Sequence, residues 1–144
     1  MSHTFHTDSE WLEGFSGTIE PREASPPVPF GIPRDFGGQG GQWTPEHFLA
    51  AAVSSCIQAT FLSIAAPSGV ELKAYSSSAS CTMEKGASGF EVTAITVESR
   101  IVVADEKSKG RAERAIAKAE KLCPISKALG GLASLQAVVE VGNG

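Results

Sequence analysis

The chain has 144 residues, of which 42% are hydrophobic and 19% are charged, and its net charge is -4. This length is typical of one compact domain, and the composition can build a core and is not typical of a disordered chain. The basic residues are not gathered into a patch, so nothing favours nucleic-acid binding. No repeat is visible, and we expect a single domain over residues 1–144.

Membrane insertion and secretion are not indicated either. The sequence contains no run of about 20 apolar residues, which a spanning helix needs. Its N-terminus, MSHTFHTDSEW, lacks a basic region followed by an apolar stretch. We therefore expect a cytoplasmic protein that spans no membrane. In a reducing compartment, its three cysteines are expected to be thiols rather than structural disulfides.

The first 42 residues predict strand and loop. Residues 1–8 are polar and are expected to be frayed, whereas residues 11–20 alternate loosely and predict a first strand. Residues 21–42, PREASPPVPFGIPRDFGGQGGQ, hold five prolines and five glycines. That composition predicts an extended arm without a regular helix, ending in a flexible glycine loop.

A long apolar helix is predicted from WTPEHF onward. Thr44 can cap its start, Pro45 suits the first helical position, and Glu46 favours the positive end of the helix dipole. Apolar residues then recur at spacings of three and four until Pro67 and Gly69 stop the helix. Further apolar side chains widen the stripe, so we expect this helix to be central and covered on most sides.

Two strands, two helices and a last strand follow. Residues 70–84 and 90–103 are predicted to pair across the turn KGASG, and the second of them alternates as a half-buried strand does. Residues 105–123 predict a helix with a narrow apolar stripe, after which Pro124 begins the short helix PISKAL. Apolar side chains alternate again in residues 135–141, which predicts the last strand. Runs of strands, rather than strict alternation with helices, favour the α+β class.

Two cysteines occupy positions where a thiol can do chemistry. Cys123 lies at a helix N-terminus, where free N–H groups, helped by Lys121 and Lys127, stabilise a thiolate. Cys56 lies on the apolar stripe of the long helix. Packing in a core is the alternative for both positions, and position alone favours it, most clearly for Cys56, because free cysteine is common in cores. Cys81, in the serine-rich segment SSSASCTM, is interpreted as a structural thiol.

The spacing of the thiols bears on redox chemistry and on metals. If Cys56 and Cys123 meet, one can attack and the other resolve, as in a thiol that cycles through a sulfenic acid and a disulfide. No cysteine or histidine pair has CxxC or CxxH spacing, so the sequence does not favour a metal site.

Three stretches carry a family resemblance. GGQGGQWTPEHFLAAAVSSC combines a glycine-rich loop, a helix start and, ten residues after Glu46, a cysteine. ASCTMEKGASGFEVTAITVESRIVV reads as a hairpin, and KAEKLCPISKAL places a second cysteine before a proline and a short helix. Together these stretches, over about residues 30–141, resemble the OsmC/Ohr superfamily of thiol-dependent organic hydroperoxide reductases.

The resemblance implies a fold and a reaction. The fold is an intertwined homodimer whose long central helices are wrapped by antiparallel sheets. The reaction is the reduction of organic hydroperoxides to alcohols in peroxide stress defence, without a bound cofactor or metal. Cys56 would be the peroxidatic nucleophile, Cys123 the resolving thiol, and Glu46 the partner of a site arginine. A dithiol, lipoyl in the best-studied branch, would be the reductant.

The arginine is where this sequence departs from the family pattern. The best-studied branch carries it in an N-terminal strand turn, and residues 11–20 contain no arginine. Arg34, beside the glycine loop, is the preferred candidate, and Arg22 is the alternative. The chain therefore resembles an OsmC-like relative more than a close Ohr.

Helix geometry constrains how Glu46 can act. Glu46 and Cys56 are ten residues apart, about 15 Å along one helix, so they cannot touch within it. Either a long arginine spans part of the gap, or Glu46 of a second subunit approaches Cys56 at a dimer interface. Two other interpretations stay open: a different thiol-dependent enzyme on this fold, and a ligand-binding dimer whose thiols are structural.

Overall fold

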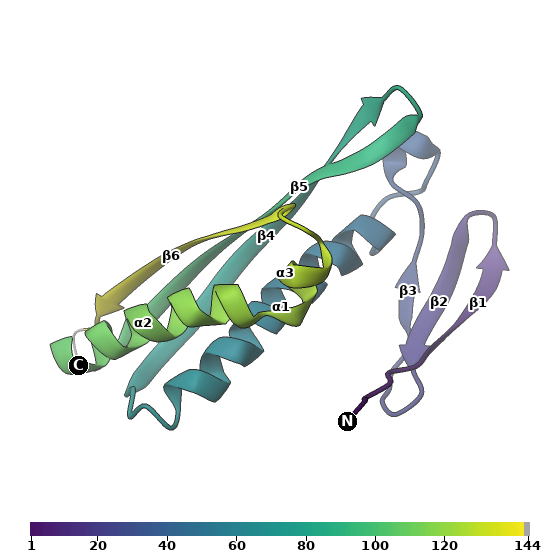
Figure 1. Cartoon of the computed structure of the whole chain (residues 1–144). Coiled ribbons are helices and arrows are strands. Elements are labelled where there is room, and N and C mark those ends of the chain that lie inside the picture. The colour runs from purple at the N-terminus through teal and green to yellow at the C-terminus, as the bar shows by residue number, and fades with distance from the viewer. Residues whose placement is uncertain (143–144) are drawn as a thin grey trace. The chain divides into compact units, whose positions relative to one another are not determined.

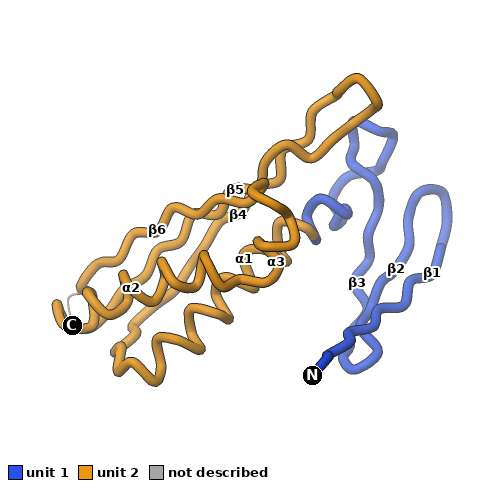
Figure 2. Tube along the Cα trace, in the orientation of Figure 1, with its two compact units in different colours: residues 1–48 blue, residues 49–144 orange. Residues whose placement is uncertain are grey.

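The computed structural model describes residues 1–142. The chain divides into two compact units, residues 1–48 and residues 49 onward (Figure 2), and the division falls inside the long helix α1, Pro45–Ala65. Each unit contains its own three-stranded sheet (Figure 1). The single domain expected over residues 1–144 stays a prediction.

The first unit is an antiparallel sheet in the order β1–β2–β3. Its elements are β1 (Thr7–Glu13), β2 (Ser16–Pro21), β3 (Val28–Phe30) and the short 3-10 helix η1 (Arg34–Phe36). The single strand predicted over residues 11–20 is therefore corrected to parts of two strands. Gly14, with a φ of 50°, turns the chain between them, a conformation that favours glycine. Strand β1 also begins within the segment expected to be frayed.

Little of the first unit is buried. Its buried residues are Gly17, Gly31 and Thr44, and every residue of β1 is exposed. Trp11 exposes 76% of its surface, and Phe5 exposes more. The first 48 residues thus form a sheet without a hydrophobic core of their own.

The second unit combines a sheet with helices on one of its faces (Figure 1). Its further elements are β4 (Leu72–Gly86), β5 (Gly89–Val103), α2 (Glu106–Leu122), α3 (Pro124–Ala128) and β6 (Ala133–Val141). The predicted hairpin is confirmed by the antiparallel pairing of β4 with β5. The α+β class is confirmed as well.

Strand β6 pairs with β5 in parallel, so this sheet is mixed rather than antiparallel throughout. A parallel partner needs a crossover connection, and α2 with α3 supplies it. The resemblance implied antiparallel sheets. The difference arises because the chain returns along the helices before β6 begins.

The core of the second unit lies between the sheet and the helices. Alternate residues of β5 point inward and meet α1 and the alanine-rich face of α2, as the periods of strand and helix require. The predicted stripe of α2 is confirmed, except that Leu122 is 44% exposed. The main core residues are Val53, Ile57, Phe61, Ile95, Val97, Ile101, Val103, Ala112, Ala115, Ile116, Ala119 and Cys123.

Helix α1 differs from expectation in two ways. It is long and apolar enough to cross a membrane by length and composition, which corrects the expectation that no such segment exists; the core helix of a soluble protein passes the same test. It is also not covered on most sides, because 28% of its most apolar stretch is buried inside the chain. Much of an apolar helix is therefore left uncovered by its own chain.

Candidate functional site

Helix α1 begins at the predicted cap. The Thr44 hydroxyl oxygen accepts a hydrogen bond from the His47 amide at 3.4 Å, and the Thr44 amide donates to His47 Nδ1 at 3.0 Å. This is the reciprocal arrangement of a capping box, with histidine where glutamate or glutamine is usual. Glu46 lies between them in the first turn, and its Oε2 is buried without a hydrogen-bond partner among the described residues.

Cys123 joins two helices. Its amide donates to the Ala119 carbonyl at 2.9 Å and ends α2, while its sulfur accepts a hydrogen bond from the Ser126 amide at 3.4 Å and caps α3. Pro124 occupies the first position of α3 and has no N–H. The first free amides of α3 are therefore those of Ile125 and Ser126, and both interact with this sulfur.

The two predicted redox cysteines are brought together. Helices α1 and α2 run antiparallel in the second unit (Figure 1), so Cys56 in α1 meets Cys123 at the end of α2 within hydrogen-bonding reach. Both residues are in the thiol form. Cys56 is half-buried, whereas Cys123 has no exposed surface.

The pKa values of the two thiols move in opposite directions. Burial raises the pKa of Cys56, and its hydrogen bond with Cys123 raises it further, more than the Ile125 amide and Thr60 lower it. Burial also raises the pKa of Cys123, but hydrogen bonds from Cys56, Ser126 and Ile125 outweigh this effect, so the pKa lies below its ordinary value. Cys123 is thus the better thiolate, as its position at a helix start predicts.

The candidate arginines do not meet Glu46. Arg34 Nη2 donates to the Gln39 carbonyl at 3.2 Å and so closes the glycine loop. Arg22 binds both carboxylate oxygens of Asp8, at 2.9 and 3.0 Å. Within residues 1–142 neither arginine forms an ion pair with Glu46. The arginine–glutamate pair implied by the resemblance is therefore not made inside the described chain.

The remaining thiol lies in the second sheet. Cys81 is half-buried on β4, opposite Ile95 of β5. The part of the chain that the structure describes holds no group of three side chains suited to a metal ion.

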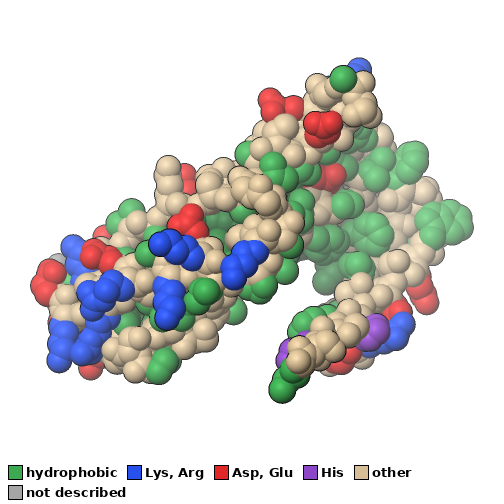
Figure 3. All heavy atoms as spheres, in the orientation of Figure 1, with side chains coloured by type: hydrophobic (Ala, Val, Ile, Leu, Met, Phe, Trp, Pro, Cys, Tyr) green, Lys and Arg blue, Asp and Glu red, His purple; other side chains and the backbone are tan. Residues whose placement is uncertain are grey.

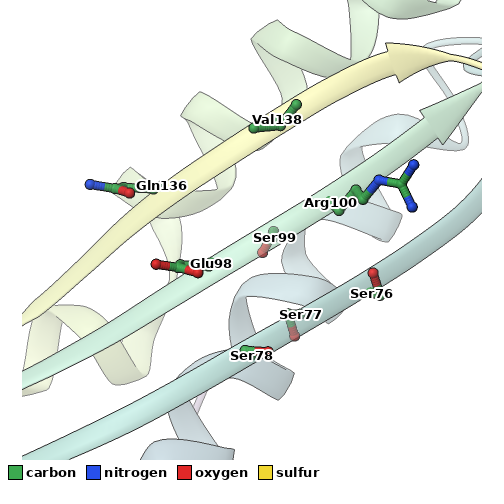
Figure 4. Close-up of a pocket in the computed structure, with 8 residues that line it drawn as sticks. All are labelled: Ser76, Ser77, Ser78, Glu98, Ser99, Arg100, Gln136 and Val138. Carbon is green, nitrogen blue, oxygen red and sulfur yellow. The ribbon is translucent and has the colours of Figure 1, made fainter.

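Two hollows were not predicted from the sequence. One of about 380 Å³ lies between α1, α3 and the start of β6, and its lining includes Ile57, Ser126 and Leu135. A larger one, of about 560 Å³, lies on the outer face of the second sheet, where Glu98, Arg100 and Gln136 project from neighbouring strands (Figure 4). The thiols do not line this larger hollow, so size alone does not identify the site.

Sequence reasoning also missed the roles of Ile125 and Ser126. Their contribution comes from backbone amides, which no side-chain motif reveals. The proline at the first position of α3 was the available signal, because it leaves the next two amides as the first free donors.

A two-sheet α+β fold with two thiols between its long helices agrees with what the resemblance to the OsmC/Ohr superfamily implied. The chain belongs to this superfamily, because the OsmC-like protein family matches residues 38–136. No curated protein sequence matches the chain.

Solved structures share the fold at low sequence identity. An OsmC-like protein of unknown function from Vibrio cholerae is 18% identical, with a TM-score of 0.83 over 95% of this chain and 100% of that one. The organic hydroperoxide resistance protein OsmC from Legionella pneumophila is 22% identical, with a TM-score of 0.69 over 98% of each chain. OhrB of Bacillus subtilis is 18% identical, with a TM-score of 0.65 over 97% of this chain and 98% of that one.

Proposed function

We propose that this protein is a cytoplasmic, thiol-dependent peroxidase that reduces organic hydroperoxides to alcohols. Cys56 is the nucleophile and Cys123 is the resolving thiol. The hydrogen-bonding contact between the two thiols carries the proposal, because an oxidised sulfur would have its resolving partner within reach. The names of the Legionella and Bacillus proteins, which refer to organic hydroperoxide resistance, support the substrate class.

The chemistry balances over two thiols and one peroxide. The Cys56 thiolate attacks the O–O bond, an S–O bond forms, and the alkoxide leaves and takes up a proton, so the peroxide is reduced by two electrons and the sulfur becomes a sulfenic acid. The Cys123 thiolate then attacks that sulfur, an S–S bond forms, and hydroxide leaves as water after protonation. A dithiol, for which lipoyl is the leading candidate, returns the two electrons by thiol–disulfide exchange.

Accessibility assigns the two roles. Cys56 is half-buried and Cys123 has no exposed surface, so a peroxide reaches Cys56 first. The low pKa of Cys123 suits a resolving thiol, which must ionise to attack. It also suits a leaving group, because a sulfur of low pKa is expelled faster when the reductant attacks Cys56. The pKa of Cys56 is raised, and none of the groups that shift it in the described chain is a cation, so its activation needs a cation brought close to the sulfur.

A second copy of the chain supplies that cation in this proposal. Glu46 lies about 15 Å from Cys56 along α1, so the Glu46 beside Cys56 would come from the other subunit of a homodimer. Arg34, released from the Gln39 carbonyl, is the preferred arginine for that carboxylate, and Arg22 is the alternative. The uncovered apolar surface of α1 and the exposed Trp11 of β1 support burial against a second copy.

Thiol counting tests the proposed cycle. The reduced protein is mixed with cumene hydroperoxide, and each chain is expected to lose two of its three thiols. Cys56→Ser is expected to slow peroxide consumption by about 1,000-fold or more, the scale of losing a nucleophile. Cys123→Ser is expected to accumulate a sulfenic acid that dimedone traps.

Cys81→Ser is the matched control, because it removes the thiol that takes no part in the cycle. Its peroxide consumption should equal that of the natural chain, with both thiols lost on oxidation. If Cys56→Ser and Cys123→Ser also keep the natural rate, the cycle is excluded and a ligand-binding dimer with structural thiols explains the chain better.

A further inference from the structure

A cleft in the second unit gathers three cations between its long helices. It lies where the end of α1 meets the middle of α2 and has a volume of about 300 Å³. Two arginines, a lysine and a serine line it, over an apolar floor of one isoleucine and one alanine. These residues are Ile64, Ser68, Arg111, Arg114, Ala115 and Lys118.

This concentration of positive charge runs against the balance of the chain. The net charge is -4, yet seven of the twelve lysines and arginines lie between residues 107 and 127. Figure 3 shows these side chains gathered over α2. The basic residues of this segment alternate with Glu106, Glu113 and Glu120, so the sequence alone does not show a basic patch. The folding of α2 against the end of α1 turns part of that charge into a concave site.

Two glycines leave room for the arginine side chains at the cleft. Arg111 Nη1 donates to the Gly69 carbonyl at 3.2 Å, and a Cβ at position 69 would lie 2.9 Å from that nitrogen. Gly69 has a φ of 73°, so glycine both permits this turn and leaves room for the guanidinium. Arg114 Nη1 lies 3.5 Å from the Cβ position of Gly110. Arg111 is thereby held in place before any ligand arrives, with its other N–H groups still available.

Among the described residues, none of the three cations of the cleft forms an ion pair. In the described residues the ion pairs are Arg22–Asp8 and Arg100–Glu140, so the cleft contributes to neither. Asp105 interacts electrostatically with Arg111. Hydrogen bonds from Ser108 lower the pKa of Asp105 most, and the nearby positive charges lower this pKa further. That carboxylate caps α2 by accepting the Ser108 amide at 2.7 Å and does not line the cleft.

We propose that this cleft binds a phosphate dianion, either free or as the monoester of a small metabolite. Guanidinium groups match phosphate oxygens with paired hydrogen bonds, and three positive charges balance a dianion better than a single carboxylate. The volume accepts a phosphate with a few attached carbons, which the side chains of Ile64 and Ala115 would contact. The site lies eight residues beyond Cys56 in α1, about 12 Å along the helix, and does not depend on the proposed peroxidase activity.

Calorimetric titration of the full-length reduced protein with inorganic phosphate, at constant ionic strength and neutral pH, tests the site. Saturable binding at one site is expected. The double variant Arg114→Gln/Lys118→Gln is expected to bind at least tenfold more weakly. Both residues are exposed, so their replacement should leave the thermal midpoint unchanged. Lys73→Gln/Lys85→Gln removes the same charge from exposed positions on β4 and should bind within twofold of the natural chain.

Further titrations identify the ligand class and can overturn the proposal. Glycerol 3-phosphate binding more tightly than inorganic phosphate would assign the site to phosphomonoesters, and equal binding would assign it to phosphate itself. Acetate binding as tightly as phosphate would contradict a dianion site. Equal weakening in both double variants would reduce the effect to overall charge, and absence of saturable binding to the natural chain would exclude the site.

Discussion

The two compact units of this chain bury apolar surface to very different extents. The second unit places α1 and α2 against its sheet and closes a core around Phe61 and Ile95. The first unit has a sheet of the same strand number, but no helix covers it within its 48 residues, and Trp11 remains 76% exposed. A sheet needs a second layer to be stable. The difference therefore indicates that the second unit carries the stability of the chain.

Core truncation should separate the two units most strongly. Phe61→Ala removes a ring with no exposed surface that packs at 5.5 Å on Tyr75, and is expected to lower the free energy of unfolding by about 3–5 kcal/mol. Trp11→Ala removes an exposed ring of the first unit and should cost about 0.5 kcal/mol or less in the monomer. Urea unfolding at low protein concentration measures both values. Similar losses would mean that the first unit contributes to the same core.

A smaller effect is expected from a buried polar link in the second unit. The Ser108 hydroxyl oxygen accepts a hydrogen bond from the Glu71 amide at 3.0 Å, joining the segment before β4 to α2. Ser108→Ala leaves that amide without its partner and is expected to cost about 1–3 kcal/mol. Ser63→Ala is the control, because this exposed hydroxyl bonds a carbonyl of its own helix and its loss should be nearly neutral. Equal losses of unfolding free energy in both variants would show that the hydrogen bond between Ser108 and Glu71 does not stabilise the fold.

The smallest expected effects are changes in the pKa values of Cys56 and Cys123. If the second unit alone sets the two pKa values, Cys56→Ala should raise the pKa of Cys123, which loses a hydrogen-bond donor. Cys123→Ala should lower the pKa of Cys56, which loses the interaction that raises it. Thiolate absorbance followed against pH, in a Cys81→Ser background, measures both shifts. Shifts of the same sign would place the dominant influence outside this pair.

Local chemistry explains why the starts of the long helices could be predicted from the sequence. Thr44 and Pro45 start α1, and Asp105 caps α2, because each satisfies backbone groups a few residues away. The buried side of α1 was less predictable, since the helix is apolar on most sides and period alone cannot rank its faces. The sequence favoured a stripe through Cys56, whereas the fully buried face runs through Ile57 and Phe61.

Contacts between distant segments account for what was missed. The parallel register of β6 and the cation cleft each depend on partners that no short window contains. In the candidate site, the meeting of Cys56 with Cys123 was anticipated by family resemblance, and the structure brings those thiols together. The partner of Glu46 could not be predicted, because the preferred candidate, Arg34, donates its hydrogen bond to a carbonyl of its own loop.

The parallel placement of β6 shapes how a nascent chain acquires this fold. Strands β4 and β5 are adjacent in sequence, and a hairpin of this kind forms in about 1–10 μs. Strand β6 can join β5 only after the intervening helices have formed, and its Val139 completes the core. A chain released before β6 is made would keep one edge of β5 unpaired, and such edges promote aggregation.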